Sequence, residues 1–356
     1  MSQVISPNSI KGVSLFAGAG GLDVGFERAG VSVVLANEFD QYAAASWRAN
    51  RPQNADAMIE GDIRDIMHRF DSLNGKVDIV FGGPPCQGFS VAGKMDPNDP
   101  RSALVWSFLD VVEKIRPKCF LIENVKALGT LAKWESIRQG IVNRASELGY
   151  QVTYRVQIAS DFGVPEKRER VFFVGVRDFD GDINILYKNL DNYKKTPPTV
   201  REVLRCTGKY NSKTNPNTCS ARISLAQKPV LRVSPYAGML VNGAGRPVNL
   251  DACSPTLPAT MGGNKTPIID ENALQDPKAT NWFVTYHQHL VSGNPVLNEV
   301  PDFIRRMTIS EAAAIQTFPE KYIFCGPKGR HYCQIGNAVP CLMAEAMAKA
   351  IIDSFL

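Results

Sequence analysis

The chain has 356 residues, of which 44% are hydrophobic, so it can bury a sizeable core and exceeds one average domain. We see no signal peptide and no uncharged apolar run near the ~20 residues that span a membrane, and we expect a cytoplasmic protein. The net charge is +5, yet residues 185–265 hold twelve Lys and Arg against three acids, which leaves about −4 elsewhere. A basic segment on a mildly acidic body favours a polyanionic partner, although a lysine-rich surface region would have the same composition.

The first half of the chain alternates strand-like and helix-like stretches, which is typical of a parallel sheet covered by helices. We expect strands at residues 12–16, 32–36, 77–81 and 119–123, and helices at 22–29, 41–50 and 101–115. The runs GYQVTYRVQIAS and RVFFVGVR predict an antiparallel hairpin that closes the sheet.

The second half is richer in Asn, Lys, Thr, Gly and Pro, which predicts a loop-rich second domain after about residue 182. Regular structure returns near residue 305, where Thr308 and Glu311 have the spacing of a capping box. A last amphipathic helix is expected at residues 341–355. Eight cysteines form no CxxC pair, so most of them are expected to be small buried hydrophobes.

The stretch VSLFAGAGGLDVGFERAG places closely spaced small residues between a strand and a helix, where a ligand can approach the backbone. Glu38 ends the next strand and could accept hydrogen bonds from both hydroxyls of a ribose. Together they suggest an adenosine-containing cofactor. The loop alone fits tight strand–helix packing equally well, because Asp23 stands where a dinucleotide fingerprint has a third glycine. Asp62 in GDI would face the same crevice, or would serve only as a turn or N-cap residue.

The stretch FGGPPCQGFS begins at the end of the apolar strand VDIVF, where open α/β sheets bind their ligands. Prolines fix the backbone before Cys86 and a glycine lets it turn afterwards, which predicts a nucleophilic thiol; Cys119 fits an inert buried one better. A thiolate requires nearby positive charge, and Arg168 and Arg170 are candidates. Glu123 ends the neighbouring strand and is expected beside Cys86 as a hydrogen-bonding acid.

With these motifs the chain resembles the cytosine-C5 DNA methyltransferases of bacterial restriction–modification systems. The resemblance rests on FAGAGG, Glu38, GDI, GGPPCQGFS, ENV, RER, RMTISEAAAIQTFPEKY and QIGNAVP, which follow the family's order over residues 16–340. It implies an α/β fold with a doubly wound, Rossmann-like mixed sheet and a smaller, loop-rich target-recognition domain. We therefore expect a discontinuous catalytic domain at 1–182 and 303–356 and a recognition domain at 183–302. One departure is Glu166, where the family usually has the glutamine of Gln-x-Arg-x-Arg.

The resemblance also implies S-adenosylmethionine as methyl donor, with S-adenosylhomocysteine as product and no metal. Glu38 would hold the ribose, Asp62 and Ile63 would meet the adenine, and Phe39 would stack on it. The full expected cofactor set is Phe16, Gly18, Gly20, Glu38, Phe39, Asp62, Ile63, Pro84, Leu104, Asn337 and Val339.

In the implied reaction the Cys86 thiolate attacks C6 of a flipped-out cytosine, and the methyl group goes to C5. Glu123 would bind N3 and the exocyclic amino group, Arg170 would contact O2, and Arg168 would help hold the site. The basic segment would bind double-stranded DNA, and a single subunit would act apart from any cognate restriction endonuclease. We assign DNA contacts to Gln87, Ser90, Arg232, Arg246, Asn264 and Lys265.

Three alternatives stay open at this point. An RNA cytosine methyltransferase would share the architecture, and activity on tRNA comparable with that on DNA would identify it. A nucleic-acid-binding protein without catalysis is disfavoured by the intact Cys86, Glu123, Arg168 and Arg170. A nicotinamide-dependent dehydrogenase would explain only the glycine loop. His287 and His289 lack a third ligand at suitable spacing for a metal.

Overall fold

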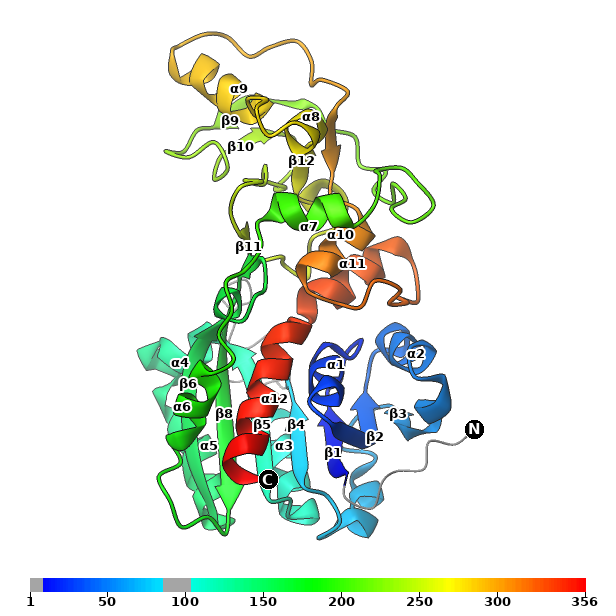
Figure 1. Cartoon of the computed structure of the whole chain (residues 1–356), viewed down its shortest axis with the longest axis vertical. Helices are drawn as coiled ribbons and strands as arrows, with labels where there is room; N and C mark the ends of the chain where they lie inside the picture. Colours follow the sequence, from blue (N-terminus) through cyan, green and yellow to red (C-terminus); the bar gives the residue numbers. More distant parts are fainter. Residues whose placement is uncertain (1–8, 86–103) are drawn as a thin grey trace. The chain divides into compact units, whose positions relative to one another are not determined.

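The computed structural model describes residues 9–85 and 104–356, and the chain divides into two compact units (Figure 1). The first unit comprises the described parts of 1–163, 169–196 and 338–356, and the second comprises 164–168 and 197–337. These boundaries differ from the predicted domains, since 183–196 pack in the first unit and 303–337 in the second. The division into a cofactor domain and a recognition domain stays a prediction.

The first unit contains a seven-stranded mixed sheet in the order β3-β2-β1-β4-β5-β8-β6. Strands β1 to β5 are mutually parallel, whereas β8 runs antiparallel to both β5 and β6. The predicted parallel sheet with an antiparallel hairpin at its edge is therefore confirmed. The strands are β1 (Ile10–Leu15), β2 (Val31–Glu38), β3 (Met58–Glu60), β4 (Ile79–Gly82), β5 (Cys119–Val125), β6 (Tyr150–Ile158) and β8 (Glu169–Arg177).

Helices cover this sheet, and the apolar central strands are buried between them. The α-helices of this unit are α1 (Gly21–Arg28), α2 (Gln41–Ala49), α3 (Leu104–Ile115), α4 (Lys126–Thr130), α5 (Glu135–Glu147), α6 (Ile185–Asp191) and α12 (Cys341–Phe355). Short 3-10 helices are found at Pro52–Ala57, Met67–Leu73, Ala132–Trp134 and Ala159–Asp161.

The C-terminal helix α12 returns to the N-terminal part of the unit and packs on α1 (Figure 1). Two glycines one turn apart on α1 permit this approach. A Cβ at Gly21 would lie 2.7 Å from the Val339 carbonyl oxygen, and a Cβ at Gly25 would overlap Ala344. Part of the stretch Lys328–Phe355 is apolar enough to cross a membrane by composition, but 67% of that 18-residue part is buried within the protein.

The second unit is loop-rich, as predicted, and its described strands form two-stranded sheets. These strands are β7 (Glu166–Lys167), β9 (Leu225–Val230), β10 (Met239–Val241), β11 (Ser254–Pro255), β12 (Ile268–Asp270) and β13 (Ile304–Arg306). Its helices are α7 (Val200–Cys206), α8 (Glu271–Gln275), α9 (Trp282–Val291), α10 (Ile309–Ile315), α11 (Lys328–Asn337) and the 3-10 turn Gly263–Lys265. A small core joins β10, β12, α9 and β13 through Leu240, Ile268, Phe283, Tyr286 and Ile304.

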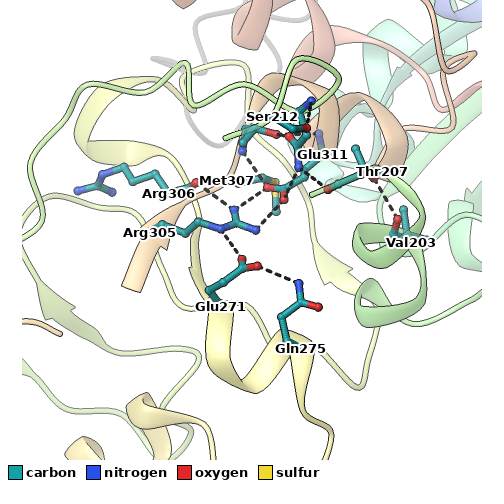
Figure 2. A network of polar contacts seen from close by, with 12 residues as sticks. Val203, Thr207, Ser212, Glu271, Gln275, Arg305, Arg306, Met307 and Glu311 are labelled. Carbon is teal, nitrogen blue, oxygen red and sulfur yellow. Dashed lines mark hydrogen bonds and ion pairs between the residues drawn. The ribbon is translucent and has the colours of Figure 1, made fainter. Parts of the chain in front are cut away.

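Buried charges reinforce that core. The predicted capping box at the start of α10 is present: Thr308 accepts from the Glu311 N–H, and Glu311 accepts from the Thr308 N–H. The same Glu311 carboxylate pairs with Arg305, which also contacts Glu271 at 2.7 Å (Figure 2). One arginine thus connects α8, β13 and α10.

Candidate active site

The turn between β1 and α1 has an unusual backbone. Phe16, Gly18 and Gly20 all have positive φ, at 53°, 57° and 91°. A positive φ is energetically costly for phenylalanine and easy for glycine, so the backbone of the turn is strained at Phe16. No atom lies within 4 Å of where a Gly18 Cβ would stand. The turn therefore leaves open space beside the N-terminus of α1, whose N–H groups favour electron-rich ligand atoms.

Glu38 lies at the end of β2 and is tied to this turn. Its Oε2 accepts from the Gly18 N–H and its Oε1 from the Asp40 N–H, both at 2.8 Å. Burial raises the pKa of the Glu38 carboxyl, and the N–H donors of Asp40 and Gly18 oppose that shift. Each carboxylate oxygen keeps a further lone pair, so Glu38 can still accept from two hydroxyl groups.

Phe39 and the GDI motif flank Glu38. Phe39 is 74% exposed, which is unusual for a phenylalanine and leaves its ring accessible for stacking. Asp62 is held by the Arg64 guanidinium at 2.6 Å, and these hydrogen bonds lower the pKa of Asp62. The Ile63 side chain is buried in the core of the first unit. Any contact that Ile63 makes with a ligand therefore involves its backbone.

The other expected cofactor residues are divided between the two units. Pro84 is buried after β4, and its carbonyl accepts from the Asn124 Nδ2 at 3.2 Å. Leu104, at the start of the described part of α3, packs against the core. Val339 is buried against Gly21 in the first unit, whereas Asn337 ends α11 in the second unit and is exposed.

Glu123 and Arg170 meet on adjacent antiparallel strands. The pairing of β5 with β8 places Val125 opposite Arg170, and the Arg170 Nε lies 2.7 Å from the Glu123 Oε1. Both side chains are largely buried. A Cβ at Gly83 would lie 2.7 Å from the Glu123 Oε2, so only glycine at position 83 leaves Glu123 this place. The arginine fixes the Glu123 carboxylate at the strand ends, where it can accept hydrogen bonds from a bound group.

Arg168 belongs to the second unit, although it is only two residues from Arg170. Its buried guanidinium donates to the carbonyl oxygens of Leu257 at 3.2 Å and Gly336 at 2.8 Å. Glu166 is also buried, accepts from the Leu257 N–H at 2.5 Å, and lies 3.7 Å from Arg168. The predicted role of Arg168 at the reaction centre stays a prediction, since its described contacts join segments of the second unit.

Three predicted site residues, Cys86, Gln87 and Ser90, lie outside the described residues. The structure does describe the strand that leads to them. Gly82 approaches β1 so closely that a Cβ would overlap the Leu15 carbonyl, and Asn124 fixes the Pro84 carbonyl. The chain is therefore held at the end of β4, beside the end of β5 where Glu123 lies.

The predicted DNA-contacting residues of the second unit are all exposed, and they fall on three segments of the chain. Arg246, Asn264 and Lys265 lie on paired segments, because Gly245 donates to the Asn264 carbonyl and Ile268 to the Arg246 carbonyl. Arg232 lies on the loop between β9 and β10.

Sequence reasoning assigned no role to Arg306, which organises these segments. Its buried guanidinium donates to the carbonyl oxygens of Ala221, Asn242, Asn264 and Thr266. Burial lowers the pKa of Arg306, which still remains a cation at neutral pH. Arg306 lies within the motif RMTISEAAAIQTFP, but no sequence pattern predicts that a side chain donates to backbone carbonyls far away in the sequence.

In the part of the chain that the structure describes, no cluster of three His, Cys, Asp or Glu is placed to hold a metal. The two histidines of α9 contact backbone oxygens. His287 Nε2 lies 2.7 Å from the Arg232 carbonyl, and His289 Nε2 lies 2.7 Å from the Pro295 carbonyl.

Comparison with known proteins gives matches along the whole chain. A family profile described as C-5 cytosine-specific DNA methylase matches residues 10–353. Type II methyltransferase M.PspPI of Psychrobacter sp. (strain TA137) is 35% identical, covering 96% of this chain and 78% of the relative. M.Eco47II of Escherichia coli is 32% identical, covering 98% and 80%.

Solved structures agree on the fold. A DNA modification methyltransferase encoded within an E. coli prophage has a TM-score of 0.65 at 24% identity, covering 97% of this chain and 99% of its own. The S. pombe Dnmt2 methyltransferase also has a TM-score of 0.65, at 16% identity, with 97% and 99% covered. These likenesses confirm the predicted α/β methyltransferase fold.

Proposed function

Since the chain belongs to the C-5 cytosine-specific DNA methylase family, we propose that it transfers a methyl group from S-adenosylmethionine to C5 of a flipped-out cytosine in a short, specific duplex sequence. Its relatives are type II methyltransferases of restriction–modification systems, and the chain is a DNA cytosine-5 methyltransferase of that kind. The Glu123–Arg170 pair beside Gly83 is the observation that carries the residue assignments.

The residues of the first unit fit the proposed cofactor. Glu38 keeps lone pairs for the two ribose hydroxyls, exposed Phe39 offers a ring to the adenine, and Gly18 leaves the backbone open. Asp62 would accept from the adenine amino group with a lone pair that Arg64 does not use. When bound, S-adenosylmethionine supplies an electrophilic methyl group.

The protein residues would make C5 nucleophilic. The Cys86 thiolate adds to C6, and the ring electrons move to C5, which takes the methyl group. Loss of the C5 proton to a base then expels Cys86 and restores the ring. Glu123 would share a proton with N3 and accept from the exocyclic amino group, which stabilises the charge that develops on attack.

Arg170 has a donor suited to the cytosine O2. Its Nε contacts Glu123 and its Nη1 donates to the Glu169 carbonyl, so Nη2 can serve the base. In this proposal Arg170 both orients Glu123 and contacts O2.

The duplex itself would be bound by the second unit. A thiol cannot reach C6 inside stacked DNA, so the base must flip, and contacts to phosphates supply affinity for the flanking duplex. Exposed Arg232, Arg246, Asn264 and Lys265 are the proposed contacts. We further propose a monomer that acts in the cytoplasm, apart from any cognate endonuclease.

The test is transfer of labelled methyl from S-adenosylmethionine to mixed-sequence duplex DNA, followed by base-resolution mapping of 5-methylcytosine. One recurrent methylated motif is expected, and Cys86→Ala should abolish transfer, whereas Cys206→Ala, at an exposed cysteine of α7, should not. Transfer to tRNA in preference to DNA, or full activity of Cys86→Ala, would contradict the proposal.

A further inference from the structure

The loop between β9 and β10 exposes apolar side chains in its first three residues, 231–233, which we call the tip. Leu231 is 40% exposed and Val233 is completely exposed, with exposed Arg232 between them. Single exposed apolar residues are common, but two beside a cation at the tip of one loop indicate a surface that is covered by a partner.

A side chain of α9 holds the backbone of the tip in place. His287 lies buried on α9, and its Nε2 contacts the Arg232 carbonyl at 2.7 Å. Since a carbonyl only accepts, the histidine must donate from Nε2. The Ala237 N–H also closes a turn onto the Ser234 carbonyl at 3.0 Å. Phe283 and Tyr286 anchor α9 in the core that includes Leu240 of β10. The tip is thus presented on a packed base.

The charge around the tip selects a polyanion. No acid occurs between Glu202 and Asp251, and the same stretch contains seven Lys and Arg. Within residues 9–85 and 104–356, exposed Arg222, Lys228 and Arg232 form no ion pair. Phosphates would satisfy these cations, but phosphates alone give no reason for exposed leucine and valine. Duplex DNA offers both chemistries, since its grooves expose base edges and thymine methyl groups between the phosphate rows.

We propose that Leu231 and Val233 form an apolar contact with base edges in a groove of the duplex, flanked by Lys228 and Arg232 on phosphates and positioned by His287. This inference rests on the proposed function, because the partner is the DNA that the enzyme methylates. It adds Leu231, Val233 and His287 to the residues that determine binding.

The first experiment compares Val233→Ser with Val291→Ser, a matched change at an exposed valine of α9. The probe is a 30-base-pair duplex that carries the site mapped by methylation. Loss of a buried valine contact should raise the Kd of Val233→Ser about tenfold, with Val291→Ser unchanged. The dependence of Kd on salt should be unaltered in Val233→Ser, because no phosphate contact is lost. Lys228→Ala should lower the salt slope by about one, unlike Lys278→Ala, an exposed lysine outside the acid-free stretch.

His287 is tested by rescue. His287→Ala should weaken binding to the level of Val233→Ser, and His287→Gln, which keeps a donor, should recover most of it. His289→Ala serves as the control, since that ring contacts Pro295 instead.

A wild-type enzyme that methylates DNA, with Val233→Ser binding equally well, would overturn the inference while leaving the proposed function intact. Absence of both DNA binding and methyl transfer in the wild type would overturn the two together. Tighter binding of single-stranded RNA of the same sequence, lost in Val233→Ser, would overturn duplex DNA as the partner.

Discussion

Gly83→Ala should slow methyl transfer strongly while reducing the stability of the fold only slightly. A Cβ at position 83 would stand 2.7 Å from the Glu123 Oε2, whereas ordinary contact begins at 3.4 Å. The carboxylate must therefore move by about 0.7 Å from the position in which the Arg170 Nε lies 2.7 Å from its Oε1. A misplacement near 1 Å can cost about a hundredfold in rate, so we expect the rate of methyl transfer to fall between about tenfold and a hundredfold.

The assay is single-turnover methyl transfer at saturating S-adenosylmethionine and DNA, with cofactor binding and thermal unfolding measured on the same samples. Overpacking should cost about 1–2 kcal/mol of stability, and cofactor affinity should hold. Gly262→Ala is the control, because its backbone is extended and no atom lies within 4 Å of the new Cβ. A Gly83→Ala enzyme with the wild-type rate, or an equal loss in Gly262→Ala, would refute the steric account of Glu123.

Three further changes test the folded state. Burial raises the pKa of Asp23, whose carboxyl oxygen accepts from the Trp47 indole. The Asp23 carboxyl group therefore stays protonated to a higher pH in the native state than in the unfolded chain. Stability should therefore fall as pH rises from the ordinary carboxyl pKa to the raised one, and Asp23→Asn should lose that slope in denaturant titrations across pH. Arg306→Met should cost about 3 kcal/mol in urea unfolding and weaken DNA binding, because it leaves buried carbonyls without a donor; unchanged stability would contradict this. Gly25→Ala should lower the melting temperature despite a helix-propensity gain of about 1 kcal/mol, because its Cβ overlaps Ala344, whereas Gly329→Ala, with open space, should raise it.

The strands of the sheet were predictable because their positions depend on apolar runs and on short-range signals. IVF, residues 79–81, and CFLI are continuous apolar stretches, as is typical of strands buried on both faces, and both lie in strands of the structure. The turn after β1 was predictable for a related reason, because closely spaced glycines favour positive φ and close approach, although Phe16 also adopts a positive φ there. The Thr308 capping box is equally local, since both of its hydrogen bonds lie within four residues.

The second unit escaped prediction where long-range contacts determine it. Helices α7, α8 and α9 lie in a region that composition predicts to be loops, and short helices such as these depend on tertiary packing. His287 was considered only as a metal ligand, because nothing in YHQHL points to a backbone carbonyl 55 residues away. Buried arginines that bind carbonyls have no sequence signature, so Arg306 was missed.

Arg168 and Arg170 show how far a motif can be read residue by residue. They are two positions apart, yet Arg170 contacts Glu123 in the first unit and Arg168 contacts Leu257 and Gly336 in the second. The Arg-x-Arg spacing alone cannot assign the partner of each arginine, and their roles at the reaction centre stay predictions.

Glu166, the one departure from the family pattern, can be understood from the same contacts. Its Oε1 accepts from the Leu257 N–H, and the amide oxygen of a glutamine could accept that bond equally well. Only the carboxylate, however, adds a negative charge 3.7 Å from Arg168, which also donates to the neutral carbonyls of Leu257 and Gly336. A buried guanidinium is less costly beside such a charge, so the substitution keeps the hydrogen bond to Leu257 and adds an ion pair to the arginine that follows.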